Sequence, residues 1–459
     1  MSKDPALTPW RAELRETLRL AAPLAATNLL QMLVHAIDVI FIARLGEKPL
    51  AASSLGIAIF GLTLWGMTAM ATACAPLIAA ELGRRRHAVR EVRRSVRMAL
   101  WLAVGLGLGG MAIGFSGKAI LRASGQDAEI AALAGDFLAI LSWAMIPMVA
   151  ASVMRTFVAA LGKPGYATWI TILAVGVNLL GNWALVFGNF GMPALGLKGS
   201  AISSLLTSSA MILAYGLVVR SDRKLRRYRV LGRWWRPEWQ RLREIVRIGV
   251  PIALTVLAEA GLFSVAALLM GRIGEVELAA HTVALNVAAL AFQIPFGINQ
   301  AATIRVGYHY GAGDRAALGR AGWCSILMSV SFMATTAAAM LLAPITILRL
   351  YTDPAAPANA AMVAFAVQYM AIAAAFQLFD GAQAVAAGAL RGLQDTSVPL
   401  AIALFGYWGV GFTVSFGLGF HTQLQGVGVW IGLAMGLVVA AVLLTWRWHR
   451  REALGLVPA

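Results

Sequence analysis

Apolar runs of about 20 residues recur along the whole chain, separated by short polar stretches. A helix rises about 1.5 Å per residue, so a run of this length crosses the roughly 30 Å hydrocarbon core of a bilayer. The runs predict twelve membrane-spanning helices, at residues 18–42, 50–82, 96–116, 128–160, 165–188, 198–219, 247–271, 278–310, 318–343, 358–390, 396–418 and 425–446. We therefore expect an all-α, multi-pass membrane protein.

The composition excludes the main alternatives to a membrane protein. The 459 residues are 59% hydrophobic and 13% charged, whereas soluble domains average about 25% charged residues. Intrinsic disorder is also excluded, because it requires low hydrophobicity together with high net charge. The net charge of +17 alone would suit a nucleic-acid-binding protein. The positions of the basic residues distinguish that class from a membrane protein.

The basic residues are concentrated at the two chain ends and in alternate connections between the apolar runs. Most of the 38 Lys and Arg residues follow this pattern, and the exceptions are Arg44, Lys48, Lys118, Arg122, Lys198, Arg272 and Arg349. Cytoplasmic connections of membrane proteins carry an excess of Lys and Arg. Both termini and the basic connection 220–247 are therefore predicted to be cytoplasmic. The charge indicates orientation in a lipid bilayer, and nucleic acid is not an expected partner.

The two halves of the chain resemble each other. An alignment without gaps that places Pro23 on Pro251 also places the segment 44–52 on the segment 272–280. Chance similarity between apolar helices rich in Ala, Leu and Gly is the alternative. Each half contains six predicted spans, so the repeats run parallel, an organisation found in transporters that alternate access to a central site.

The repeat and the basic connection predict three parts of the chain. Residues 1–219 form an N-terminal six-helix bundle, 220–247 a basic cytoplasmic linker, and 248–459 a C-terminal six-helix bundle. The two cysteines, Cys74 and Cys324, lie far apart in or beside apolar segments. We expect both to be small buried hydrophobic side chains, with no disulfide.

Three carboxyl side chains interrupt the apolar segments: Asp38, Glu259 and Asp380. A charged side chain at the centre of a spanning helix costs about 2.5–3.5 kcal/mol on insertion scales, and such residues commonly mark ion or proton pathways. A structural interhelical hydrogen bond is the alternative. A buried carboxyl group takes up a proton more readily than one in water, and its oxygens can also bind Na⁺. Cation coupling is therefore the predicted role of these acids.

Other polar side chains lie close to these acids in the sequence. Asn178 and Asn182 are four residues apart and share one face of a helix, where they could hold the Asp38 carboxylate or only connect helices. His35 lies one turn before Asp38 and is expected to be a hydrogen-bonded structural histidine more than a titrating partner. Arg155, late in the fourth span, is expected to extend towards the cytoplasm.

Several segments together resemble one transporter family. They are "DVIFIARLGEKPLAA" from Asp38, "GNWALVFG" in the fifth span, Glu259 in the seventh, "RVGYHYGAG" in the eighth, and "FDGAQAVAAGALRGLQDTSVP" around Asp380. This pattern resembles the multidrug and toxic compound extrusion (MATE) family, in particular its NorM-like bacterial branch. The resemblance extends from about Pro23 to Leu444.

The resemblance implies a cation-coupled antiporter that expels organic, often cationic, drugs or metabolites while admitting Na⁺ or H⁺. It implies a multi-pass protein of the bacterial cytoplasmic (inner) membrane, acting as a monomer, with no cofactor besides the coupling ion. The coupling cation, Na⁺ included, would bind at Glu259 and Asp380. A polar site for protons or substrate in the N-terminal half would consist of Asp38, Asn178 and Asn182. Residues expected to line the cavity are Phe263, Gln383 and His35.

Two departures from the family pattern bear on the coupling ion. The aromatic residue one turn before Asp380 is Phe376, which has no hydroxyl to offer as a cation ligand. The first cytoplasmic connection reads "ELGRRRHAVREVRR" where the family has a Gly-Ala-Gly form.

Two other functions are weighed against drug antiport. A flippase for lipid-linked precursors belongs to the same broad fold group, but it would favour a hydrophilic cationic cavity, and the buried charges here are acidic. A membrane-embedded enzyme is disfavoured, because the sequence contains no HExxH or GxSxG motif and no phosphate-binding loop. We therefore expect a transporter and not an enzyme.

Overall fold

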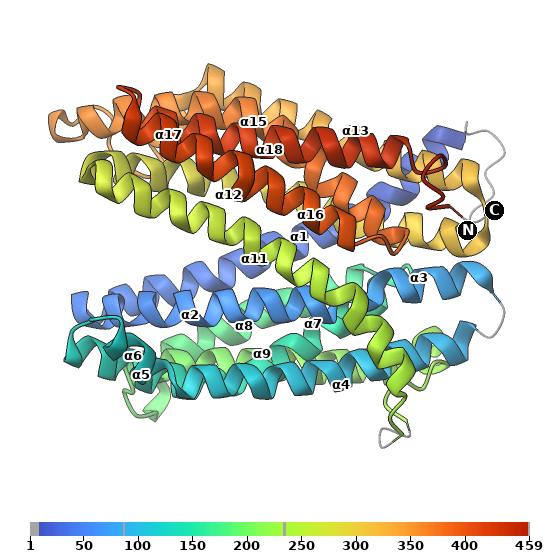
Figure 1. Ribbon diagram of the computed structural model, residues 1–459. Coiled ribbons are helices and arrows are strands. Elements are labelled where there is room, and N and C mark those ends of the chain that lie inside the picture. Colours follow the sequence, from blue (N-terminus) through green and yellow to red (C-terminus); the bar gives the residue numbers. More distant parts are fainter. Residues whose placement is uncertain (1–8, 86–87, 233–235, 458–459) are drawn as a thin grey trace. The chain divides into compact units, whose positions relative to one another are not determined.

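The computed structural model describes residues 9–85, 88–232 and 236–457, and within these ranges every regular element is a helix (Figure 1). Twelve helices or helix groups in this part of the chain are long and apolar enough to cross a membrane. The predicted all-α class and the twelve predicted spans are therefore confirmed. The cytoplasmic location of the two termini stays a prediction.

The N-terminal repeat consists of the first six spans and the short helices that connect or follow them. These elements are α1 (Pro9–Ala43), α2 (Glu47–Ala71), α3 (Cys74–Arg84), α4 (Ala88–Phe115), α5 (Gly117–Ala123), α6 (Ala128–Leu141), η1 (Ser142–Ala144), α7 (Met145–Ala160), α8 (Gly165–Phe187), η2 (Asn189–Gly191), α9 (Leu197–Ser221) and α10 (Arg223–Arg226).

The last six spans follow the same order. Their elements are α11 (Trp239–Ile273), α12 (Glu275–Ala312), α13 (Arg315–Leu342), α14 (Pro344–Leu348), η3 (Pro357–Asn359), α15 (Ala360–Gly392), α16 (Ser397–Leu404), η4 (Phe405–Phe412), α17 (Thr413–His421) and α18 (Gln425–His449).

Three predicted spans are interrupted in ways that an apolar run does not reveal. The second span breaks between α2 and α3, the fourth contains the 3₁₀ turn η1, and the eleventh contains the π-helix η4. A π-helix has a wider turn than an α-helix, and the backbone of η4 packs closely against α18. A Cβ added at Gly436 of α18 would lie only 2.8 Å from the carbonyl oxygen of Gly406. The wider turn places neighbouring aromatic side chains at the site described below.

The predicted linker 220–247 is shorter in the structure. Helix α9 continues to Ser221, α10 follows directly, and α11 already begins at Trp239. Asp222 caps α10 by accepting hydrogen bonds from the backbone N–H groups of Lys224 and Leu225, at 2.9 and 3.1 Å. Residues 233–235 of the linker lie outside the described residues. The second part of the predicted linker is therefore the beginning of the seventh span.

The chain divides into two compact units whose boundaries differ from the predicted bundles. Unit 1 contains the chain up to Ala25 and from Leu254 onward, and unit 2 is Ala26–Ala253. Helices α1 and α11 therefore belong partly to each unit. Both boundaries lie two or three residues after a proline inside the helix, Pro23 in α1 and Pro251 in α11. Proline removes a backbone hydrogen bond, which makes these positions suitable bending points.

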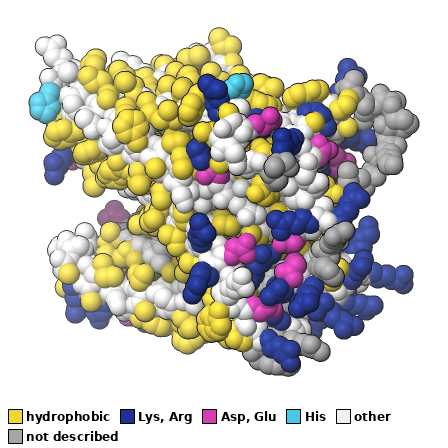
Figure 2. Space-filling model, turned by 45° about the vertical axis from the view of Figure 1, so that its right-hand side comes forward, with side chains coloured by type: hydrophobic (Ala, Val, Ile, Leu, Met, Phe, Trp, Pro, Cys, Tyr) yellow, Lys and Arg dark blue, Asp and Glu magenta, His cyan; other side chains and the backbone are white. Residues whose placement is uncertain are grey.

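Buried ion pairs hold the exchanged helix segments within their units. In unit 1, Arg305 of α12 donates two hydrogen bonds to the Glu13 carboxylate of α1, at 2.8 and 2.6 Å. In unit 2, Arg241 of α11 pairs with Glu81 of α3 at 3.2 Å. The alignment of the two halves places Glu13 on Arg241, so the two repeats use the same helix position with opposite charge. At the lower right of Figure 2, Lys and Arg side chains gather with Asp and Glu among them.

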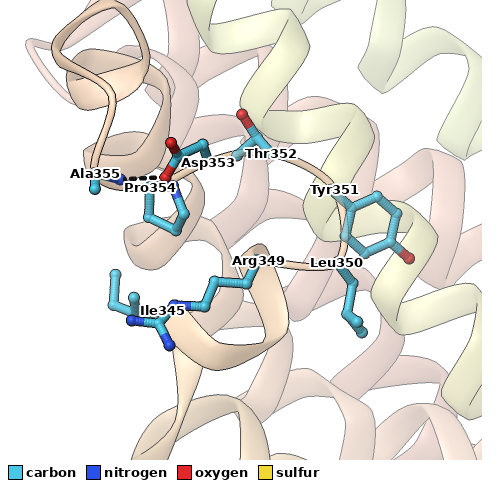
Figure 3. Close-up of a pocket in the computed structure, with 8 residues that line it drawn as sticks. All are labelled: Ile345, Arg349, Leu350, Tyr351, Thr352, Asp353, Pro354 and Ala355. Atoms are coloured by element: carbon cyan, nitrogen blue, oxygen red, sulfur yellow. Dashed lines mark hydrogen bonds between the residues drawn. The ribbon is translucent and has the colours of Figure 1, made fainter.

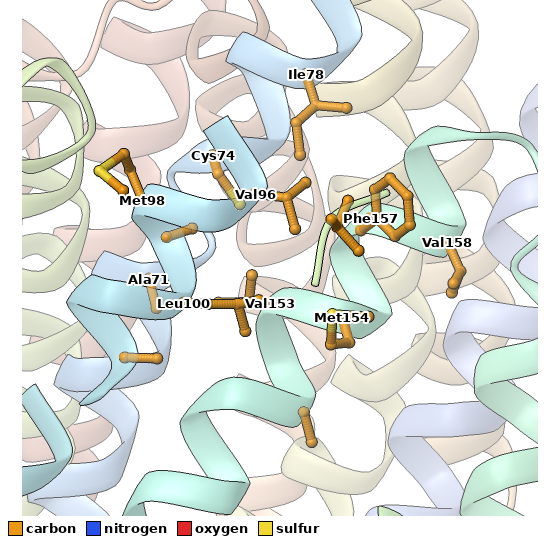
Figure 4. Close-up of a cluster of buried hydrophobic side chains, with 14 of the residues drawn as sticks. Ala71, Cys74, Ile78, Val96, Met98, Leu100, Val153, Met154, Phe157 and Val158 are labelled. Carbon is orange, nitrogen blue, oxygen red and sulfur yellow. The ribbon is translucent and has the colours of Figure 1, made fainter. Parts of the chain in front are cut away.

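Each unit has its own apolar core. The core of unit 2 consists of close-packed aliphatic side chains with Phe157, and it includes Cys74 (Figure 4). The core of unit 1 contains an aromatic stack, in which the ring centroids of Tyr369 and Phe376 lie 5.8 and 5.7 Å from the ring centroid of Trp430. Cys74 and Cys324 are both buried and free. This confirms their predicted role as buried side chains outside any disulfide.

Candidate functional site

Two of the three predicted acids lie together in unit 1. Glu259 is on α11 and Asp380 is on α15, and the Gln383 side chain connects them. The Gln383 amide nitrogen donates to Asp380 Oδ1 at 3.1 Å and to Glu259 Oε1 at 3.4 Å. The sequence predicted Glu259 and Asp380 as the coupling site and Gln383 as a cavity-lining residue, and in the structure Gln383 bonds both acids.

Two aromatic residues of the π-helix η4 support this carboxylate pair through hydrogen bonds to its neighbours. The Tyr407 hydroxyl donates to the Gln383 amide oxygen at 2.7 Å. The Trp408 indole N–H donates to the carbonyl oxygen of Ala258, next to Glu259, at 3.1 Å. Sequence reasoning missed both aromatic residues. Their only signal was a pair of polar-tipped aromatic side chains in a glycine-rich span, and such side chains usually find a hydrogen-bond partner when buried.

The pair of carboxylates is removed from water without a close counter-charge. Asp380 is 8% exposed, Gln383 and Tyr407 are buried, and Glu259 is half-buried. Among the described residues of unit 1, no Lys, Arg or His forms an ion pair with either acid, although Arg391 lies within electrostatic range of Glu259. Two neighbouring carboxylates repel each other more strongly in a medium of low dielectric constant. The arrangement therefore favours binding of a proton or a small cation.

The donor set suits a hard cation more than a transition metal. Within the described part of the chain, no group of three or more His, Cys, Asp and Glu side chains could hold a metal ion. The available donors are carboxylate and amide oxygens, which hard cations prefer.

The third predicted acid, Asp38, lies in unit 2 with both predicted asparagines. Asp38 Oδ1 accepts hydrogen bonds from the side-chain amides of Asn178 and Asn182, at 2.9 and 2.7 Å. Its Oδ2 accepts from the Ser204 hydroxyl at 3.2 Å. Both asparagines are fully buried on α8. Of the two alternatives, the asparagines therefore hold the Asp38 carboxylate. Sequence reasoning missed Ser204, whose only signal was a serine-rich stretch in α9.

A close approach of α8 and α9 places Ser204 beside Asp38. A Cβ added at Gly181 of α8 would lie 2.5 Å from the Ser203 hydroxyl of α9. Ser203 itself donates to the backbone carbonyl of Asn178 at 3.1 Å. The small side chains at this helix contact therefore fix the position of the hydroxyl that bonds Asp38.

The remaining predicted residues are more loosely connected to these groups. Phe263 is half-buried and packs against the apolar core of unit 1, one turn after Glu259 on α11. His35 is exposed and lies within electrostatic range of Asp38. Phe376 is buried in the aromatic stack of unit 1, and Tyr407 supplies the aromatic hydroxyl at the carboxylate pair.

The expected position of Arg155 is wrong. Its guanidinium does not extend to the aqueous surface but donates to the side-chain oxygens of Gln31 and Asn28 on α1, at 3.0 and 3.5 Å. The neighbouring amides offer acceptors inside the membrane-spanning region, so the side chain remains there.

A pocket of about 720 Å³ lies elsewhere, at the segment between α14 and η3 (Figure 3). Figure 3 shows Arg349 and Asp353 among its lining side chains. It contains none of the predicted site residues. The buried polar clusters around Glu259 and Asp38 are therefore better candidates for function than this surface pocket.

Comparison with a family model finds two matches to this chain. The model described as MatE matches residues 23–184 and 251–416. The two matches begin at residues 23 and 251, the same two positions that the alignment of the halves places on each other. The internal repeat is thereby confirmed.

Curated relatives match almost the whole chain. A "Probable multidrug resistance protein NorM" of Mesorhizobium japonicum is 46% identical over 443 residues, covering 96% of this chain and 95% of the relative. A protein of the same name from Brucella suis is 42% identical over 444 residues, covering 97% and 94%.

Solved structures share the fold. A eukaryotic MATE transporter, AtDTX14, aligns with a TM-score of 0.82 at 21% identity, covering 98% of this chain and 100% of that chain. An outward-facing multidrug resistance MATE family transporter of the MOP superfamily aligns with a TM-score of 0.86 at 20% identity, covering 97% of each chain. The two family-model matches and the near-complete curated relatives show that this chain is a member of the MatE family.

Proposed function

We propose that this protein is a multidrug efflux transporter that exchanges organic, often cationic, compounds for Na⁺ or H⁺ across the bacterial cytoplasmic membrane. The names of its full-length relatives support the substrate class. The observation that carries the coupling mechanism is the pair Glu259 and Asp380, joined through the Gln383 amide in the spanning region of unit 1.

The carboxylate pair provides the driving-ion site. When both acids are ionised, their mutual repulsion and their removal from water make the empty site unfavourable. One proton or one Na⁺ offsets this repulsion, so the site gains most from a single positive charge. Gln383, held by Tyr407, keeps the two acids close together in advance and reduces the cost of assembling the site.

The Asp38 cluster in unit 2 provides a second polar site. Three donors hold the Asp38 carboxylate, while the side-chain oxygens of Asn178 and Asn182 are buried and have no hydrogen-bond partner among the described residues. Buried acceptors of this kind favour a ligand that donates hydrogen bonds. An organic ammonium group or a proton on Asp38 meets this requirement.

The two exchanged helices connect the sites to the transport cycle. Glu259 lies on α11 shortly after the unit boundary at Leu254, and Asp38 lies on α1 after the boundary at Ala26. Each site is therefore built on a helix that also belongs to the other unit. A change in ligand at either site acts on a helix that has a proline next to the unit boundary, where bending is easiest. This suits alternating access by movement between the repeats.

The test is efflux of a fluorescent organic cation from proteoliposomes that contain the full chain. Na⁺ and pH gradients are imposed separately, and Glu259→Gln and Asp380→Asn are compared with the wild type. Glu275→Gln is the matched control, because Glu275 lies exposed at the start of α12. We expect both site variants to lose gradient-driven efflux while the control keeps it within about twofold. Wild-type efflux in both site variants would sink the proposal.

A further inference from the structure

The two repeats differ in charge at two pairs of equivalent positions. The alignment that places Pro23 on Pro251 also pairs Gln31 with Glu259 and Arg155 with Gln383. The contacts agree with this pairing: Arg155 Nη1 donates to Gln31 Oε1 at 3.0 Å, and Gln383 Nε2 donates to Glu259 Oε1 at 3.4 Å. Where unit 1 has an acid and a neutral amide, unit 2 has a neutral amide and a base.

Among the described residues, the groups that accept hydrogen bonds from Arg155 are neutral. Its partners are the amide oxygens of Gln31 and Asn28, and no carboxylate of the described part of unit 2 forms an ion pair with it. Its half-buried position on a spanning helix makes an unbalanced charge costly. The Tyr215 hydroxyl lies within electrostatic range, is fully buried, and has no hydrogen-bond partner among the described residues. A positive charge and a free donor therefore lie in one region without an anion.

A line of polar side chains connects this region to Asp38. Asn28, Gln31, His35 and Asp38 follow at spacings of three, four and three residues, so they share one face of α1. We call these four residues the polar stripe. Gln31 and Asp38 are seven residues apart, about 10 Å along the helix axis. The polar stripe therefore has a basic partner at one end and an acid at the other.

We propose that Arg155, with Gln31 and Asn28, binds the carboxylate of an organic substrate whose positive group interacts with Asp38 at the other end of the polar stripe. The proposal rests on the transport function proposed above and names a substrate class for unit 2. The planar guanidinium matches a carboxylate in a two-point contact, which a neutral amide does not provide. A molecule with charges separated by about 10 Å spans the distance along α1.

A pair of probes that differ in one group isolates the contact. A rhodamine ethyl ester is a cation, and its free acid adds a carboxylate to the same ring system. The KM for efflux of each probe is measured in proteoliposomes with the full-length wild type, Arg155→Gln and Arg155→Lys. Arg44→Gln is the matched control, because Arg44 is exposed, lies directly after the end of α1 at Ala43 and belongs to the same unit.

Arg155→Gln is expected to raise the KM of the free acid tenfold or more, because a hydrogen bond to a charged group contributes about 1.5–3 kcal/mol. The KM of the ester should change less than twofold. Arg155→Lys should lie between the wild type and Arg155→Gln, since it keeps the charge but loses the planar contact. Arg44→Gln should leave both probes unchanged.

Gln31→Glu provides a second test that keeps the arginine. The new carboxylate would pair with Arg155, as an internal anion, and should raise the KM of the free acid without raising that of the ester. Equal changes for ester and acid in Arg155→Gln and Gln31→Glu would overturn the proposal and indicate a structural role or an inorganic anion. Failure of the wild type to carry the acid while it carries the ester would overturn this inference alone. Failure to carry either probe would contradict the transport function itself.

Discussion

Replacing Glu13 by Gln removes one partner of a buried ion pair without changing the side-chain shape. In the wild type the Glu13 carboxylate accepts two hydrogen bonds from Arg305, and His309 Nε2 lies 3.5 Å from its Oε2. The Glu13 and Arg305 side chains are 7% and 12% exposed. The variant therefore leaves the Arg305 guanidinium in unit 1 with an uncharged amide as its main partner.

The expected loss of stability follows from this burial. Breaking a buried ion pair on one side typically costs about 3–5 kcal/mol, because the remaining charge is desolvated and uncompensated. The control is Glu129→Gln, which removes the acid of the pair Lys48–Glu129, where the two side chains are 63% and 61% exposed. Water solvates both of these groups, so the control should change the stability little.

Thermal unfolding in detergent, followed with a thiol-reactive dye, measures the difference. Cys74 and Cys324 are buried and free, so each becomes reactive only when its unit opens. Glu13→Gln should lower the unfolding midpoint clearly, and Glu129→Gln should not. The double variant Glu13→Gln with Arg305→Gln should recover part of the loss, because it removes the stranded charge. Equal midpoints for Glu13→Gln and Glu129→Gln would refute the reasoning.

Tyr407→Phe removes the hydroxyl that holds the glutamine amide between the two carboxylates, and an unsatisfied buried acceptor costs about 1–3 kcal/mol. It should raise the coupling-cation concentration for half-maximal efflux about fivefold or more. The control is Tyr369→Phe, since the Tyr369 hydroxyl is buried and has no hydrogen-bond partner among the described residues, and it should change this concentration less than twofold. Gly199→Ala would place a Cβ 2.3 Å from a backbone carbonyl of α8 and should lower the unfolding midpoint, while Gly216→Ala, which has open space on the same helix, should not. Asp222 pairs with Lys163 and caps α10, and these contacts hold the pKa of the Asp222 carboxyl below the usual range. The contribution of Asp222 to stability is therefore full above about pH 4 and falls as the pH decreases. The stability advantage of the wild type over Asp222→Asn should therefore decrease progressively in melts as the pH falls below about 4, and an advantage that stays constant as the pH falls would contradict this assignment.

The apolar pattern predicts the fold class well, because the length of a spanning helix depends on bilayer thickness and little else. It does not predict breaks inside a span. The π-helix η4 packs closely against Gly436, a contact between segments that are separate in the sequence. The exchange of the first parts of α1 and α11 between units likewise depends on packing. Pro23 and Pro251 lie two or three residues before the unit boundaries, but they do not predict which neighbours each part of the helix has.

The acids of the candidate site were predictable because charged side chains are rare in spanning helices. Asp38, Glu259 and Asp380 stand out in apolar segments, and helical spacing connected Asn178 with Asn182. Tyr407 and Ser204 were not predictable in the same way. Hydroxyl groups are common in spanning helices, and only the three-dimensional contacts show which of them bond a carboxylate or its amide partner.

Arg155 shows a different limit of sequence reasoning. Its position late in a span favoured extension towards water, but two amides on α1 lie near enough to accept its hydrogen bonds. The repeat contained the relevant signal, since the alignment that pairs Gln31 with Glu259 also pairs Arg155 with Gln383. Comparison of contacts between the repeats is needed to recognise that signal.

Equilibrium binding of the coupling cation to the purified full chain shows directly whether Glu259 and Asp380 form the coupling site. Uptake of radioactive Na⁺, and of protons by pH electrode, is measured without substrate for the wild type, Glu259→Gln, Asp380→Asn and the control Glu275→Gln. We expect saturable binding of one of these cations to the wild type and the control, and loss of that binding in both site variants. Undiminished binding in Glu259→Gln and Asp380→Asn would contradict the assignment of the carboxylate pair as the coupling site.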